Sequence, residues 1–108
     1  LLERHADWLV PHHRDPVSGL LVIGIHGWLV RTPRHTILID ACAGNDKDRV
    51  RPETAEFHRQ RTPWLDRLAA HGVAPEQVDF VMCTHLHVDH VGWNTRLADG
   101  RWVPTFPN

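Results

Sequence analysis

Thr84-His85-Leu86-His87-Val88-Asp89-His90 places three imidazoles and one carboxylate within six positions of the chain. His85 and His87 are two residues apart, so on an extended backbone their side chains leave the same face and can bind one metal ion. Asp89 and His90 follow as the chain turns, and they could hold a second ion beside the first. Nitrogen and oxygen ligands in this mixture suit Zn²⁺, and also iron or manganese. The H-x-H-x-D-H spacing therefore predicts a metal site rather than a histidine-rich surface loop.

The rest of the chain alternates between extended and helical patterns. Runs rich in Leu, Ile and Val, bounded by Gly, Pro and polar residues, predict strands. The segments that we expect to be extended are residues 6–10, 20–31, 36–39 and 78–83. A helix is expected from Thr62 to His71, with Thr62 as its N-cap, Pro63 in its first position and Gly72 as its stop. Its apolar stripe consists of Trp64, Leu65, Leu68 and Ala69.

The order of these elements predicts the fold class. Residues 20–31 and 36–39 should pair as a hairpin, and a helix between two strands indicates a crossover unit and an α/β architecture. In such sheets, ligands bind beyond the carboxyl ends of the strands. Asp40 follows one predicted strand and His85 follows another, so both face one crevice if the two strands are neighbours. A loop cap or an Asx-turn is an equally good interpretation of Asp40 taken alone.

The composition is that of one small globular domain. The 108 residues are 42% hydrophobic and 23% charged, with a formal net charge of −1. This balance gives no electrostatic basis for binding nucleic acid or an anionic membrane, and the apolar run over residues 20–25 is too short to span a bilayer. Two cysteines give no disulfide framework, which favours a reducing, cytoplasmic location. The chain starts at Leu1 without a Met and ends in what reads as the middle of a fold, so we expect a fragment.

The histidine stretch resembles the H-x-H-x-D-H signature of the metallo-β-lactamase-fold hydrolases. The strand that ends at Asp40 is similar to the first motif of that superfamily, and the run from Leu20 to Asn108 resembles its quorum-quenching lactonase and methyl-parathion-hydrolase-like members. The resemblance implies an αββα sandwich made of two similar halves. Residues 1–108 would form a partial domain, roughly the N-terminal half.

The resemblance also assigns roles to individual residues. It implies that His85 and His87 are ligands of a first metal ion, that Asp89 and His90 are ligands of a second, and that Asp40 braces the loop from behind. Two Zn²⁺ ions per complete domain are implied, with iron or manganese as alternatives. The family completes its site with a further His, a bridging Asp and a last His, all from the C-terminal half.

One departure from the family pattern concerns the first motif, which usually continues Asp-Thr-Gly. Here the sequence is Asp40-Ala41-Cys42-Ala43-Gly44. A thiol from Cys42 or Cys83 could be a metal ligand, although a buried small apolar residue is the more common role for cysteine.

The function implied is a metal-dependent hydrolase in which a metal-bound hydroxide attacks an ester-like, lactone or organophosphate substrate. Asp89 would be catalytic by shuttling a proton. The expected partner is a small-molecule substrate, and the oligomeric state is left open. Two alternatives remain at this point: a redox or thioesterase member of the same fold, of the persulfide dioxygenase or glyoxalase type, and an inactive fragment that acts only as a binding or structural chain.

Overall fold

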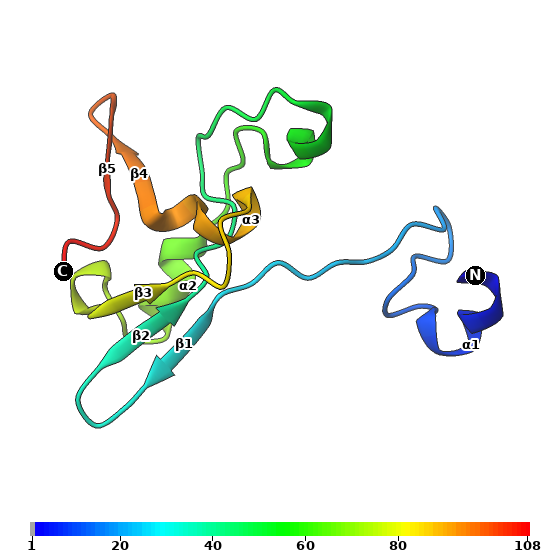
Figure 1. Ribbon diagram of the computed structural model, residues 1–108, viewed down its shortest axis with the longest axis horizontal. Coiled ribbons are helices and arrows are strands. Elements are labelled where there is room, and N and C mark those ends of the chain that lie inside the picture. The colour runs from blue at the N-terminus through cyan, green and yellow to red at the C-terminus, as the bar shows by residue number, and fades with distance from the viewer. Residues whose placement is uncertain (1) are drawn as a thin grey trace.

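The computed structural model describes residues 2–108, which form a folded body and an N-terminal segment that extends away from it (Figure 1). The segment begins with the 3-10 helix η1 (Leu2–His5) and the helix α1 (Ala6–Leu9). The strand expected over residues 6–10 is therefore wrong, because the backbone N–H of Val10 donates to the Ala6 carbonyl at 3.1 Å and closes a helical turn. The extended segment explains a radius of gyration of 16.5 Å, against about 13 Å for a compact chain of this length.

A three-stranded sheet lies at the centre of the body. Strands β1 (Trp28–Arg31) and β2 (Thr36–Ile39) pair antiparallel, and β2 pairs parallel with β3 (Phe80–Met82). The parallel pair is joined by a crossover that contains the helix α2 (Trp64–Ala70). The predicted hairpin and the predicted α/β crossover are thus confirmed. Because β2 and β3 are neighbours and run in the same direction, the residues that follow them meet at one edge of the sheet.

The strand expected over residues 20–31 is shorter than the sequence pattern indicated. Residues 20–27 are extended but lie outside the sheet, and pairing begins only where Trp28 lies opposite Ile39. The chain beyond Ile39 turns away at Asp40, so β2 offers no partner to residues 20–27, of which Leu21 forms an isolated antiparallel bridge with Arg14. Leucine, isoleucine and valine side chains between residues 20 and 25 are consequently exposed.

The helix α2 (Trp64–Ala70) has its N-cap and its first helical position one residue later than expected. Pro63 occupies the N-cap position, so the expectation that Thr62 caps the helix is wrong. Thr62 pairs instead with Asn45, whose side-chain amide donates to the Thr62 carbonyl and whose oxygen accepts the Thr62 backbone N–H, both at 2.9 Å. Gly72 follows the helix with φ +72°, a conformation that glycine adopts without strain, and the expected stop is confirmed.

One face of the sheet packs against α2. Leu38 is 2% exposed at the centre of this face, with Leu29 and Val81 as its neighbours on the adjoining strands. Leu68 is the buried residue of α2, whereas Ala69 of the predicted stripe is exposed. The buried core consists of Leu38, Ala41, Cys42, Leu68, Val73, Val78, Trp93 and Phe106.

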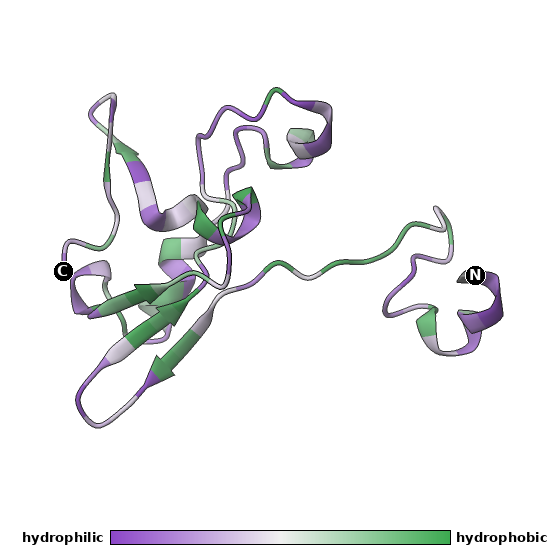
Figure 2. Cartoon of the chain, viewed as in Figure 1, coloured by the Kyte–Doolittle hydropathy of each residue, from purple (hydrophilic) through white to green (hydrophobic). Residues whose placement is uncertain are grey.

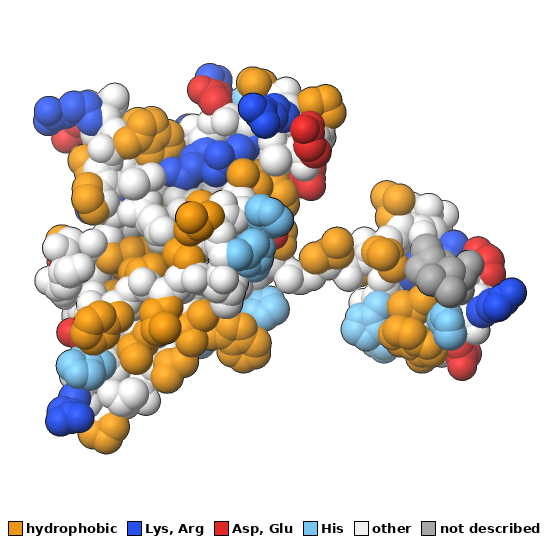
Figure 3. Space-filling model, viewed as in Figure 1, with side chains coloured by type: hydrophobic (Ala, Val, Ile, Leu, Met, Phe, Trp, Pro, Cys, Tyr) orange, Lys and Arg blue, Asp and Glu red, His pale blue; other side chains and the backbone are white. Residues whose placement is uncertain are grey.

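The other face of the sheet is also apolar. Its two cross-strand rows are Trp28, Ile39, Met82 and Val30, Ile37, Phe80. These side chains include some of the most exposed large hydrophobic groups of the body, among them Trp28 at 62% and Met82 at 56%. Hydropathy colouring shows the three strands as largely hydrophobic (Figure 2), and hydrophobic side chains gather over them (Figure 3). A sheet that is apolar on both faces is built to be covered on both, as in the sandwich that the resemblance implies.

Several short elements surround the sheet and complete the body. They are the 3-10 helices η2 (Pro52–Phe57), η3 (Pro75–Gln77) and η4 (Gly92–Asn94), the helix α3 (Val88–Val91), and the hairpin of β4 (Thr95–Ala98) and β5 (Arg101–Pro104). Within residues 2–108, none of the helices has the length and apolar character needed to cross a bilayer.

Candidate metal centre

Asp40 anchors the histidine loop to the end of β2. Asp40 is 6% exposed, and its backbone has φ 61° as the chain leaves the sheet. One carboxylate oxygen accepts the backbone N–H of Thr84 at 2.8 Å. The other accepts the Thr84 hydroxyl at 2.8 Å and lies 2.9 Å from Nδ1 of His90. Asp40 therefore contacts both the first residue and the last histidine of the loop, as expected for a residue that braces it.

These contacts decide the charge of Asp40. Burial opposes ionisation, but hydrogen bonds from His90 and from the backbone and hydroxyl of Thr84 outweigh it and lower the pKa of Asp40 to about 2. The carboxyl group is thus an anion at neutral pH and can only accept hydrogen bonds. With an anion as its partner, Nδ1 of His90 is the protonated nitrogen of that ring. The opposite nitrogen, Nε2, is then free to bind a cation when the imidazole is neutral.

A second connection holds the exit of the loop. The backbone N–H of Ala41 donates to the His90 carbonyl at 2.6 Å, and the N–H of Gly92 donates to the Cys42 carbonyl at 2.6 Å. A Cβ atom at Gly92 would fall closer than 3.0 Å to the backbone carbonyl of Ala43. Glycine is therefore required at this position so that the two segments can approach.

The three imidazoles of the loop lie against one another. The ring centroids of His85 and His87 are 4.6 Å apart, and those of His85 and His90 are 3.9 Å apart. Histidine side chains gather on the surface beside α3 (Figure 3). The rings of His85 and His87 are exposed, while His90 is half-buried above Asp40. The fold thus brings His85, His87, Asp89 and His90 together at the edge of the sheet.

The donor set fits a zinc ion in its chemistry and, for one pair, in its geometry. Nε2 of His90 lies 3.4 Å from Oδ2 of Asp89. Two ligand atoms about 2.0–2.2 Å from a tetrahedral Zn²⁺ are roughly 3.3–3.5 Å apart, so this pair has the spacing of two ligands on one ion. Within residues 2–108, no three or more His, Cys, Asp or Glu side chains converge on a common centre as they stand. His85 and His87 would have to turn from their edge-to-face contact to bind together.

A cavity of about 410 Å³ adjoins the loop. Its walls come from the loop and from η2, which contacts α3. The lining residues are Glu53, Thr54, Phe57, Leu86, His87, Val88 and Asp89. Sequence reasoning missed the contribution of η2 to this site, since η2 is some thirty residues from the loop in the chain.

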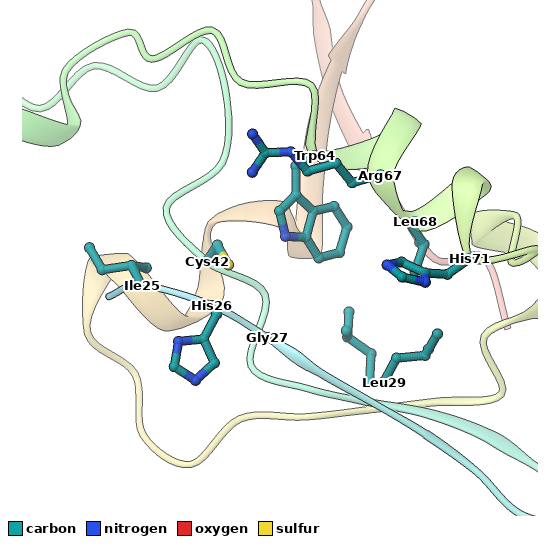
Figure 4. Close-up of a pocket in the computed structure, with 10 residues that line it drawn as sticks. Ile25, His26, Gly27, Leu29, Cys42, Trp64, Arg67, Leu68 and His71 are labelled. Carbon is teal, nitrogen blue, oxygen red and sulfur yellow. The ribbon is translucent and has the colours of Figure 1, made fainter. Parts of the chain in front are cut away.

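Neither cysteine joins the site. Cys42 is 8% exposed in the core, and burial raises the pKa of its thiol. It lines a different cavity, on the α2 side of the sheet, together with Trp64 and Leu68 (Figure 4). None of the histidine-loop residues lines that cavity. Cys83 is half-buried and accepts the Asn94 amide at 3.5 Å. Cys42 is therefore best described as a small apolar core residue.

The tryptophans and arginines that follow the loop also lie elsewhere. Trp93 is 5% exposed and stacks on Trp64 in the core, with ring centroids 5.5 Å apart. Trp102 is on the β4–β5 hairpin, where the Lys47 ammonium lies 3.8 Å above its ring. Arg96 and Arg101 are exposed on the same hairpin. None of these four residues lines the cavity beside the histidine loop.

Comparisons with known proteins identify the family of the chain. Residues 20–108 match the model of the metallo-beta-lactamase superfamily. The whole chain superposes on the crystal structure of AbOPH, a hydrolase in the beta lactamase superfamily, with a TM-score of 0.67 and 32% sequence identity. The chain spans 32% of the length of that structure. No curated protein shows a significant match. Members of the matched superfamily generally bind metal ions. The chain belongs to the metallo-beta-lactamase superfamily.

Proposed function

We propose that this chain supplies the first part of the active site of a zinc-dependent hydrolase. The observation that carries the proposal is the pair formed by Asp89 and His90, whose ligand atoms lie 3.4 Å apart, the spacing of two ligands on one tetrahedral ion. The fixed contact between His90 and Asp40 supports it, because metal-ligating imidazoles usually donate their other N–H to a carboxylate or a carbonyl.

The residues divide into two metal positions. His85 and His87 would hold a first ion, and Asp89 with His90 would hold a second, while Asp40 orients His90. Bound zinc would act as a Lewis acid and make water a usable nucleophile near neutral pH. Asp89 is suited to accept and return a proton during hydrolysis, because its carboxylate lies at the wall of the adjoining cavity. The remaining ligands would come from outside this chain, which spans 32% of the AbOPH structure.

The adjoining cavity supports a small, partly apolar substrate. Phe57, Leu86 and Val88 form an apolar wall of the 410 Å³ cavity, and His87 with Asp89 completes the side nearest the metal positions. An ester, a lactone or an organophosphate with an apolar substituent could rest on this wall with its polar centre beside the ligands. The hydrolase activity of AbOPH agrees with this class of reaction.

The test uses the complete domain that contains this chain. Metal content is measured by mass spectrometry, and turnover is measured with a lactone, an aryl ester and an aryl phosphotriester. We expect zinc in the purified protein and a loss of at least about 100-fold in kcat/KM for His85→Ala and His87→Ala, since each removes a metal ligand. His12→Ala is the matched control, because His12 is exposed on the N-terminal segment far from the loop.

Two outcomes would contradict the proposal. Unchanged turnover in both histidine variants would exclude a role for the loop in the reaction. A single iron ion in place of zinc, with thiol-dependent oxygen consumption, would instead favour the persulfide dioxygenase type.

A further inference from the structure

Thr84 stands between the carboxylate of Asp40 and two imidazoles. Its hydroxyl lies 2.8 Å from Oδ2 of Asp40, 3.1 Å from Nδ1 of His85 and 3.4 Å from Nδ1 of His90. Its backbone N–H donates to the other oxygen of the same carboxylate at 2.8 Å. These two bonds to one carboxylate fix the position of the hydroxyl as well as that of the backbone.

The protons in this cluster can be placed one at a time. Both oxygens of the Asp40 carboxylate accept hydrogen bonds from Thr84, one from its backbone N–H and the other from its hydroxyl, so the single proton of the hydroxyl points at Oδ2. The hydroxyl oxygen can then only accept from its other neighbours. The bond to His85 at 3.1 Å therefore requires a proton on Nδ1 of that ring.

We infer that the Thr84 hydroxyl is a positioning group that selects the Nδ1–H tautomer of His85 and leaves its Nε2 atom free for a metal ion. The tautomer of a neutral imidazole is set by the hydrogen bond that its other nitrogen makes. Asp40 selects the same Nδ1–H tautomer of His90 by direct contact, with Nδ1 of His90 2.9 Å from Oδ2 of Asp40. A single carboxylate thus orients two imidazoles, one by direct contact and one through the hydroxyl of Thr84.

His87 provides an internal comparison. Its ring contacts His85 edge to face, and no hydrogen bond to the His87 ring is present within the described residues. The cluster of Asp40 and Thr84 therefore does not determine the tautomer of His87. The inference concerns protonation in the metal-free protein, and its use in catalysis rests on the proposed metal site.

The experiment reads the tautomers by long-range ¹H–¹⁵N NMR of the histidine rings in the metal-free protein, at about pH 8 where imidazoles are neutral. In the wild type, His85 and His90 should carry their proton on Nδ1. In Thr84→Val, which matches threonine in shape and lacks the hydroxyl, His85 should shift toward a mixture of tautomers while His90 stays as it is. Thr84→Ser, which keeps the hydroxyl, should restore the wild-type state of His85.

Zinc affinity of the complete domain gives a second readout. Residues that orient a ligand typically contribute about 10- to 100-fold to metal affinity, so Thr84→Val should weaken zinc binding by about tenfold and Thr84→Ser by much less. The inference would be overturned by a proton on Nε2 of His85 in the wild type. It would also be overturned if a folded Thr84→Val variant kept the wild-type tautomer of His85. Expected tautomers without zinc binding by the complete domain would instead contradict the proposed function, so the two failures are distinguishable.

Discussion

Replacing Gly92 with alanine should destabilise the protein, although the backbone of Gly92 suits alanine. Gly92 has φ −60° and ψ −46°, the right-handed helical conformation. In that conformation alanine is normally favoured over glycine by about 0.5–1 kcal/mol. However, the new Cβ atom would lie closer than 3.0 Å to the carbonyl carbon and oxygen of Ala43. The conflict is with backbone atoms, so no change of side-chain rotamer can relieve it.

The size of the effect follows from the bonds that would be lost. The segments around Ala41 and Gly92 are joined by three backbone hydrogen bonds of 2.6–2.8 Å, which link Ala41 to His90, Gly92 to Cys42, and Trp93 to Ala41. Each such bond contributes about 0.5–1.5 kcal/mol, and overpacking adds about 1–3 kcal/mol. After subtracting the helical preference of alanine, the expected loss is about 1.5–7 kcal/mol. This is a large part of a typical domain stability of about 5–15 kcal/mol.

Urea denaturation followed by circular dichroism measures this loss, and Gly24→Ala is its matched control. A Cβ atom at Gly24 has His26 Nδ1 as its nearest neighbour, at an ordinary contact distance of 3.7 Å. We expect a clear fall in the midpoint for Gly92→Ala and a change within about 0.5 kcal/mol for Gly24→Ala. Equal midpoints for the two variants would show that the segments do not approach as closely as described, and would refute the reasoning.

Three further predictions concern charge, substrate and core. Asp40→Asn should remove an acid transition. The pKa of Asp40 is lowered to about 2, so its ionised form stabilises the fold above about pH 4, and this stability is lost as the pH falls toward 2. Unfolding of the variant and the wild type as a function of pH measures the difference. Phe57→Ala should raise KM for apolar esters about tenfold with little change in kcat, whereas Val17→Ala, on the N-terminal segment, should leave KM unchanged. Leu38→Ala should lose about 2–5 kcal/mol of stability, against at most about 0.5 kcal/mol for Val17→Ala at a 94% exposed position.

The parts of the fold that the sequence predicted are those specified by neighbouring residues. The hairpin and the stop at Gly72 each depend on residues within one turn, and the crossover was predicted from the order of a strand, a helix and a strand that each have a local pattern. The errors fall where a distant segment decides the structure. Residues 20–27 have a strand composition, yet strand formation needs a partner, and β2 ends too early to supply one. Thr62 has the side chain of an N-cap, yet it pairs with Asn45 instead.

The same distinction applies to the candidate site. The four proposed ligands lie within six positions, so their spacing alone indicated a metal site, and Asp40 could be added because parallel neighbouring strands end at the same edge of a sheet. The role of Thr84 depends on three distances to groups on two segments, and no spacing in the sequence encodes them. Phe57 reaches the loop only because η2 folds back over α3. A short motif can therefore specify which atoms bind a metal, whereas their protonation and the wall offered to a substrate are properties of the tertiary fold.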